Sequence, residues 1–359
     1  MAGKPIPVTL LTGFLGSGKT TLLNRLINAP EMSKALVIIN EFGTIGLDHD
    51  LVAHSNEDDT VVEMASGCLC CTIKGDLQKT LKDAPWRYSR GGKRWFDRVI
   101  IETTGLADPA PIIHTIMADE KLIETYRLAE VITMVDGVNG AGTLDAQHEA
   151  LKQAAVADTI LISKTGIADT DDVKALSLRL EQINPAAEVL AALDSTNPVE
   201  LLGGASFNPD LKSADVREWL DEEAYSDHAH HHHHDHSHSH DINRHDERIS
   251  SVCMTFNEPM PAAVFDEWFG LLTSLNGVNM LRVKGLLHMK EMENPLVIHG
   301  VQHVWHPPAI LQDWPSDDRR SRIVFIMRDM EESDLRTALG FVTDRYQSAE
   351  LVGQAGLIS

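Results

Sequence analysis

The sequence predicts an α/β fold with a mainly parallel sheet, followed by a smaller α+β domain. Through the first 200 or so residues, short β-rich apolar segments alternate with longer helix-like stretches, the pattern of a parallel sheet covered on both faces. A glycine-rich turn directly follows the first of these segments. The expected strands of this sheet are 6–11, 35–39, 98–101, 129–135, 158–162 and 187–190.

The glycine-rich turn reads G-F-L-G-S-G-K-T at residues 13–20, which is the G-x-x-x-x-G-K-T pattern of a phosphate-binding loop (P-loop). Such a loop cradles phosphates with backbone N–H groups, while Lys19 reaches the β/γ oxygens and the Thr20 hydroxyl binds Mg²⁺. An ordinary strand-turn-helix is the alternative, but the helical spacing after Gly18 favours the P-loop. The sequence thus predicts a P-loop NTPase domain. Its expected phosphate-binding residues are Gly13, Gly16, Ser17, Gly18, Lys19, Thr20 and Thr21.

A second carboxylate for Mg²⁺ and a γ-phosphate sensor are expected where the strand at 98–101 ends. Glu102 would hold the ion, and the Gly105 N–H would meet the γ-phosphate. Together with Lys19 and Thr20 they form the expected catalytic set. The residues after Gly105, 106–109, are then a candidate switch that responds to hydrolysis.

Base recognition is expected after the strand at 158–162, where guanine-specific enzymes carry N-K-x-D. Here the residues are Ser163, Lys164, Thr165 and Gly166, so the base-pairing Asp is missing. Asp169 either substitutes for it or caps the following helix.

Three of the four cysteines lie together in the sequence C-L-C-C, at Cys68, Cys70 and Cys71. Thiolates suit Zn²⁺, Cu⁺ and similar ions, and three ligands leave one tetrahedral position open for a recipient's donor. The alternatives are that these residues are buried thiols or include a catalytic thiol. A catalytic thiol is not favoured, because no adjacent His is present to activate it.

An internal His-rich tract at residues 228–240 is expected to buffer or capture metal, or else to be a solvated polar loop. Its candidate ligands are His230, His231, His232, His233, His234, His236, His238 and His240. Because its acidic surroundings cannot bury a core, residues 203–248 are expected to form a flexible linker. An expression tag would instead be terminal and uniform.

Further strands are expected at 249–256, 279–288, 295–305 and 321–327, with helices at 261–275 and 331–339. The expected domains are 1–202 for the P-loop domain, 203–248 for the linker, 249–345 for the α+β domain, and 346–359 for a tail.

The amino-acid composition limits the kinds of partner that this chain is expected to bind. A formal charge of −22 argues against nucleic-acid and anionic-membrane surfaces, and the sequence has no apolar stretch near the ~18 residues of a membrane span. No export signal is recognisable, so a cytoplasmic location is expected. A homo-oligomer is possible.

These motifs together resemble the CobW-type P-loop GTPases, which include metal-insertion proteins and zinc metallochaperones. The resemblance rests on T-G-F-L-G-S-G-K-T-T-L at 12–22, N-E-F-G at 40–43, the C-x-C-C sequence, 102–109 and 163–165, and it continues into the second domain at 282–285 and 319–326. The family usually has acidic residues flanking N-E-F-G, where this chain has Ile39 and Thr44, so only Glu41 is carried over as a metal ligand.

The resemblance implies a slow, Mg²⁺-dependent GTPase that carries Zn²⁺, or Co²⁺ or another transition metal, to a client protein. No catalytic Gln or arginine finger is identifiable, which is consistent with slow intrinsic turnover. A non-catalytic metal-storage protein using the His tract is the main alternative. A zinc-dependent hydrolase is a further alternative, but the sequence shows no recognisable arrangement near the cysteines in which a carboxylate would activate a zinc-bound water.

Overall fold

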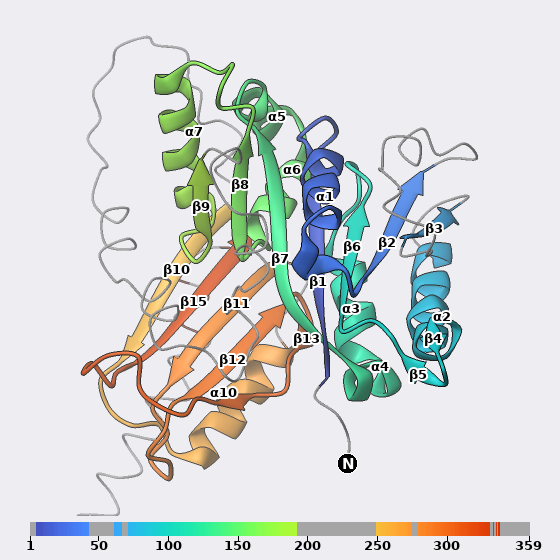
Figure 1. The fold of residues 1–359 in the computed structure, drawn as a ribbon. Helices are drawn as coiled ribbons and strands as arrows, with labels where there is room; N and C mark the ends of the chain where they lie inside the picture. The colour runs from blue at the N-terminus through green and yellow to red at the C-terminus, as the bar shows by residue number, and fades with distance from the viewer. Residues whose placement is uncertain are drawn as a thin grey trace, which may run out of the picture. The chain divides into compact units, whose positions relative to one another are not determined.

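The computed structural model describes residues 5–42, 61–66, 71–191, 249–274 and 279–330, together with Ser333, Leu335 and Thr337. The chain divides into two compact units, Met1–Trp219 and Leu220–Ser359, and each is described here by itself (Figure 1).

The first unit is built on a seven-stranded sheet with the strand order β3-β2-β6-β1-β7-β8-β9. Every neighbouring pair in this order is parallel, which confirms the expected α/β architecture. Its strands are β1 (Ile6–Gly13), β2 (Ala35–Phe42), β3 (Val61–Ser66), β6 (Arg98–Thr103), β7 (Tyr126–Asp136), β8 (Thr159–Ser163) and β9 (Glu188–Ala191). The carboxyl ends of all seven strands therefore meet at one edge of the sheet.

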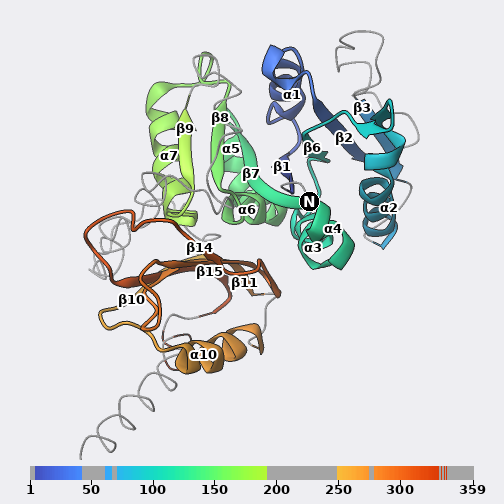
Figure 2. The same ribbon diagram turned by 60° about the horizontal axis from the view of Figure 1, so that its bottom comes forward.

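Helices cover both faces of this sheet, as Figures 1 and 2 show. Ile132 and Met134 of β7 pack in a core cluster with the leucines of α1. Thr133, between them, points the opposite way and donates to the Gln153 carbonyl of α6 at 2.7 Å. The helices are α1 (Lys19–Ile27), α2 (Cys71–Arg87), α3 (Ala110–Ala118), α4 (Glu120–Thr125), α5 (Gly140–Ala146), α6 (His148–Ala155) and α7 (Thr170–Ile183), with a 3-10 turn at Pro30–Met32.

Two features of this sheet differ from the prediction. Strand β3 was not expected, because it is a short edge strand interrupted by Glu63 and preceded by a polar, acidic stretch. Strand β7 starts at Tyr126, three residues before the expected segment, because parallel pairing with β1 already begins at the Ile6–Tyr126 pair. A separate two-stranded hairpin, β4 (Ser89–Arg90) and β5 (Lys93–Arg94), follows α2.

The second unit is an antiparallel sheet with one long helix on one face, which confirms the α+β prediction. Trp268 of α10 (Ala262–Ser274) is fully buried against the sheet and meets Phe325 edge to face at 6.4 Å. The strands are β10 (Ile249–Phe256), β11 (Met280–Leu287), β12 (Leu296–Val301), β13 (Val304–Trp305), β14 (Ala309–Ile310) and β15 (Ser321–Arg328).

The single strand expected at 295–305 is wrong, because the chain turns within it. Gln302 has a φ of 54°, a left-handed conformation that ends β12 and folds β13 back against it. Of the helix expected at 331–339, the described residues Ser333, Leu335 and Thr337 are helical. Within the described stretches, no helix is long and apolar enough to span a membrane.

Candidate nucleotide-binding site

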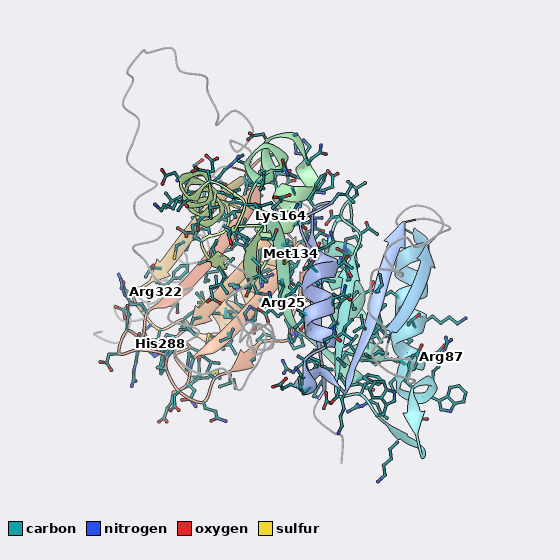
Figure 3. The ribbon with its side chains drawn as sticks, turned by 45° about the horizontal axis from the view of Figure 1, so that its top comes forward. Arg25, Arg87, Met134, Lys164, His288 and Arg322 are labelled. Carbon is teal, nitrogen blue, oxygen red and sulfur yellow. The ribbon has the colours of Figure 1, made fainter. Side chains whose placement is uncertain are left out.

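The P-loop joins β1 to α1 at the carboxyl edge of the sheet. Gly13, Gly16 and Gly18 have φ values of 135°, 73° and 96°, conformations that disfavour any residue with a Cβ. A Cβ at Gly13 would also overlap the carbonyl oxygen of Met134, the β7 residue labelled in Figure 3. The glycine spacing thus meets a steric requirement and leaves a backbone cradle with the helix N-terminus behind it.

Lys19 is the first residue of α1, and only 8% of it is exposed. Its Nζ donates to the carbonyl oxygens of Gly13 at 2.8 Å and Phe14 at 3.1 Å. The ammonium group is therefore held inside the P-loop, where a phosphate oxygen can replace these carbonyls as its partner.

The structure brings together the two residues expected at the magnesium ion. The Thr20 hydroxyl donates to Oε1 of Glu102 at 3.2 Å, although 82 positions separate them in the chain. The register explains this contact, because Glu102 of β6 lies beside Leu11 of β1 and so close to the P-loop. Glu102 is 5% exposed, and a hydroxyl and a carboxylate at this distance are oxygen donors that fit Mg²⁺.

The loop after Glu102 lies directly on the P-loop. A Cβ placed on Gly105 would come within 2.5 Å of the Leu15 backbone nitrogen, so the two backbones are in contact here. Gln153 of α6, which is fully buried, donates from Nε2 to the carbonyls of Gly105 at 3.3 Å and Ala107 at 3.0 Å. These bonds set the position of the Gly105 peptide.

The same loop is tied to α6 by an ion pair. Lys152 Nζ lies 2.9 Å from Oδ2 of Asp108, and both side chains are partly buried. The other oxygen of Asp108 accepts from the backbone N–H of Ala110, the first residue of α3, at 3.0 Å. Residues 105–108 are thus connected to both α3 and α6.

The S-K-T sequence has two different roles in this structure. The Ser163 hydroxyl donates to the Ser17 carbonyl at 2.7 Å, so it stabilises the backbone of the P-loop. Lys164, labelled in Figure 3, has a φ of 57°, and its Nζ lies 2.6 Å from Oδ2 of Asp136. Thr165 is half-buried in the turn that follows, and Thr21 is exposed on α1.

Asp136, at the end of β7, was not identified from the sequence. Burial raises the pKa of its carboxylate, but hydrogen bonds from Lys164 and from the backbone N–H groups of Val138 and Asn139 lower it, and the net pKa lies below the ordinary value. Asp136 is therefore ionised at neutral pH and fixes the Lys164 side chain. The sequence signal that could have identified Asp136 is an acidic residue at the end of an apolar segment that forms a strand next to the P-loop strand.

Asp169 caps α7, the second of the two roles expected for it. Its carboxylate accepts from the backbone N–H groups of Asp171 and Asp172, the geometry of an N-cap. At position 166 the space around a Cβ is empty within 4 Å, so the turn has room for a longer side chain.

The expected metal ligands fall largely outside the described residues. Cys68, Cys70 and the His tract lie in undescribed stretches, while Cys71 is the first residue of α2 and Glu41 pairs through its backbone with Ala65 of β3. Along the chain, the C-x-C-C sequence follows β3, which ends at Ser66, and its last cysteine begins α2. Among the residues that are described, no three His, Cys, Asp or Glu side chains form a potential metal site.

A P-loop between β1 and α1, with a carboxylate on the adjacent strand beside its Thr, defines the fold and site of a P-loop nucleoside triphosphatase. The chain belongs to the CobW/HypB/UreG family: the model for that family's nucleotide-binding domain matches residues 7–191, and the model for the cobalamin synthesis protein CobW C-terminal domain matches residues 249–342.

Characterised relatives match over nearly the whole chain. The zinc chaperone YjiA of Escherichia coli K12 is 32% identical, over 93% of this chain and 98% of the relative. The zinc chaperone CobW of a Sinorhizobium species is 28% identical, over 93% and 96%. The crystal structure of Zn(II)-bound YjiA GTPase from E. coli has a TM-score of 0.64 at 28% identity, over 95% and 99% of the two chains.

Gly105→Ala should lower the rate of GTP hydrolysis about tenfold or more, because its methyl group must displace the loop from the Leu15 backbone. Steady-state phosphate release measures this effect. The matched control is Gly142→Ala on α5, where a Cβ meets no atom within 4 Å. Equal rates for Gly105→Ala and the parent chain would contradict a close contact between the two loops.

Proposed function

We propose that this chain is a GTP-hydrolysing metallochaperone that binds Zn²⁺ and delivers it to a client metalloprotein. The observation that carries the proposal is the 3.2 Å hydrogen bond between Thr20 and Glu102 beside the P-loop, which supports a role for this pair in holding Mg²⁺. The names of the relatives, zinc chaperone and GTPase, support both halves of the activity.

In this proposal the backbone of residues 13–18 surrounds the phosphates, and Lys19 exchanges its carbonyl partners for a β/γ oxygen. Thr20 and Glu102 would hold Mg²⁺, which would supply positive charge to stabilise the phosphates. Lys19 is buried, so its charge acts on the phosphates with little screening by solvent.

The Gly105 N–H donates to the γ-phosphate, and its position depends on Gln153. When the γ-phosphate leaves, this N–H loses its partner and the loop at 106–109 is free to shift. The Gln153 and Lys152 contacts would transmit such a shift to α6, and the hydrogen bond from Ala110 to Asp108 would transmit it to α3. The loop is thus proposed as the switch that reports hydrolysis.

Base selection is proposed to depend on Lys164, which Asp136 holds in a fixed position for stacking along the base. Gly166 leaves the guanine edge without a carboxylate partner. Gly166→Asp should therefore raise the preference for GTP over ATP by about tenfold or more, because the new carboxylate can accept hydrogen bonds from the guanine edge.

Competition of GTP and ATP against a fluorescent nucleotide measures this preference. Gly166→Asn is the matched control, since it fills the same space without the carboxylate that pairs with guanine. If Gly166→Asp and Gly166→Asn changed the preference equally, the missing carboxylate would not explain base selection.

Cys68, Cys70 and Cys71 are proposed to hold the cargo ion through three thiolates, with Glu41 as an additional ligand. Three soft donors bind Zn²⁺ tightly, and in the remaining tetrahedral position a client's incoming ligand would replace the weaker Glu41 carboxylate. The His tract, with neutral imidazoles in an acidic segment, would supply weak and numerous sites that capture metal under scarcity.

The domain limits are proposed as residues 1–202, 203–248, 249–345 and 346–359. The family matches at 7–191 and 249–342 support them, because they leave the acidic His-rich segment between two separate domains.

A phosphate-release assay with GTP in the presence of Mg²⁺ distinguishes this proposal from the alternative of a metal-storage protein. The account predicts slow, saturable GTP hydrolysis by the purified full-length chain, together with one tightly bound zinc equivalent in a chelator competition titration. Zinc binding without any hydrolysis above the uncatalysed rate would favour storage.

A further inference from the structure

The hairpin after α2 carries a basic and aromatic surface that the nucleotide and metal sites do not use. Residues 86–95 read W-R-Y-S-R-G-G-K-R-W, with four Lys or Arg residues and no acidic residue, in a chain of net charge −22. We define the basic hairpin surface as Trp86, Arg87, Lys93 and Arg94.

This surface is structured. Strands β4 and β5 pair at Ser89–Arg94 and Arg90–Lys93, and the connecting Gly91 and Gly92 have φ values of 58° and 75°, the conformation of a tight two-residue hairpin turn. The buried ring of Phe96 anchors the base of the hairpin, and Arg94 donates from Nε to the Phe96 carbonyl at 2.8 Å. The hairpin therefore holds its side chains in a defined arrangement.

The charged and aromatic groups of the surface are accessible. Trp86 is 83% exposed, which is unusual for so large an apolar side chain. Arg87 and Lys93 are also exposed, and within the described part of the chain neither forms an ion pair with a carboxylate. The Arg87 guanidinium lies 5.7 Å from the centre of the Tyr88 ring, a cation–π contact that orients it. Figure 3 shows Arg87 at the outer edge of the first unit, well apart from Lys164 and Met134.

We infer that the basic hairpin surface docks an acidic segment of a partner protein, with Trp86 contacting an apolar side chain of that segment. Exposed Trp and Arg side chains are the residue types that dominate binding energy at interfaces. Complementary charge guides the encounter and selects the partner. A nucleic acid fits less well, because its many phosphates would be repelled by the rest of this acidic chain.

The position of the hairpin adds a geometric consequence. Helix α2 has 17 residues, so its end at Arg87 lies about 25 Å from its start at Cys71. Strand β6 begins just after the hairpin, which places the hairpin near the amino edge of the sheet, opposite the P-loop. A docked partner would thus leave the nucleotide site uncovered.

The test uses the full-length chain and a fluorescein-labelled peptide of about ten glutamates with two central leucines, read by fluorescence anisotropy. The same peptide with glutamines is the probe control. We expect binding of the glutamate peptide only, weakening as NaCl is raised from about 50 to about 300 mM. Trp86→Ala and the double variant Arg87→Glu/Lys93→Glu should each weaken it about tenfold or more.

The matched protein control is Lys121→Glu/Lys174→Glu, with the same charge change at two exposed lysines of α4 and α7. It should bind the peptide within about twofold of the parent chain. GTP hydrolysis and zinc stoichiometry should be unchanged in Arg87→Glu/Lys93→Glu, so failure of the docking proposal is distinguishable from failure of the proposed function.

Several outcomes would overturn the inference. Equal binding of the glutamate and glutamine peptides would show that charge does not determine binding. If the Lys121→Glu/Lys174→Glu control lost as much peptide affinity as Arg87→Glu/Lys93→Glu, the loss would come from net charge and not from this surface. Tighter binding of single-stranded poly(U) than of the glutamate peptide would assign the surface to nucleic acid. Displacement by a peptide of residues 214–227 at equal concentration would assign it to this chain's own acidic segment.

Discussion

Lys19→Ala should lower the rate of GTP hydrolysis by on the order of 100-fold or more while the chain still folds. Lys19 is buried at the start of α1, and its Nζ donates to the carbonyls of Gly13 and Phe14. Its removal takes away the cation that faces the β/γ oxygens and leaves the apolar packing of Leu22, Leu23 and Leu26 intact. Phosphate release and thermal unfolding of the same preparation measure the two effects.

Lys19→Arg is an informative companion variant. It keeps the positive charge, but a planar guanidinium does not reproduce the point charge of an ammonium group in this enclosed position. We therefore expect it to hydrolyse GTP poorly as well, whereas Lys121→Ala on the exposed face of α4 should be fully active. Full activity of Lys19→Ala would contradict the assignment of the P-loop as a catalytic site.

Replacing Cys68, Cys70 and Cys71 together with Ser should abolish the tight zinc equivalent. Hydroxyls are far poorer ligands than thiolates for Zn²⁺, so the affinity should fall by several orders of magnitude. A competition titration against a chromophoric zinc chelator measures this loss. A tight site that remained unchanged would mean that the cysteines do not hold the cargo.

Deletion of residues 228–240 is the matched control for the cysteine variant. Sites in the His tract are organised by the metal itself, so they should be weak, multiple and lost as the pH falls through about 6.5, where imidazole protonates. The deletion should lower the total zinc bound but leave the tight site and GTP hydrolysis unchanged. Loss of hydrolysis would place these histidines in the catalytic unit.

The phosphate site was predictable from sequence because its function depends on local backbone geometry. The spacing of Gly13, Gly16 and Gly18 specifies left-handed conformations within six residues, and the helix after them follows from its apolar spacing. The pairing of Thr20 with Glu102 was also predictable, since adjacent parallel strands bring their carboxyl ends together.

Contacts between distant side chains could not be predicted in the same way. Gln153 lies 48 positions from Gly105, and a glutamine on an amphipathic helix gives no sign that its amide holds a loop. Ser163 was expected to contribute to nucleotide binding near the base. Its hydroxyl donates to the Ser17 carbonyl of the P-loop, because β8 ends next to that loop. The turn at Gln302 was missed since a non-glycine residue with positive φ has no sequence signal.

The most direct test of the account is whether nucleotide and zinc binding are coupled. Zinc affinity is measured by chelator competition on the full-length chain with GDP and with a non-hydrolysable GTP analogue, and analogue affinity is then measured with and without zinc. The account predicts that the two nucleotides change zinc affinity by about fivefold or more, and that zinc changes nucleotide affinity reciprocally. Zinc affinities that were the same with both nucleotides would contradict GTP-dependent metal delivery.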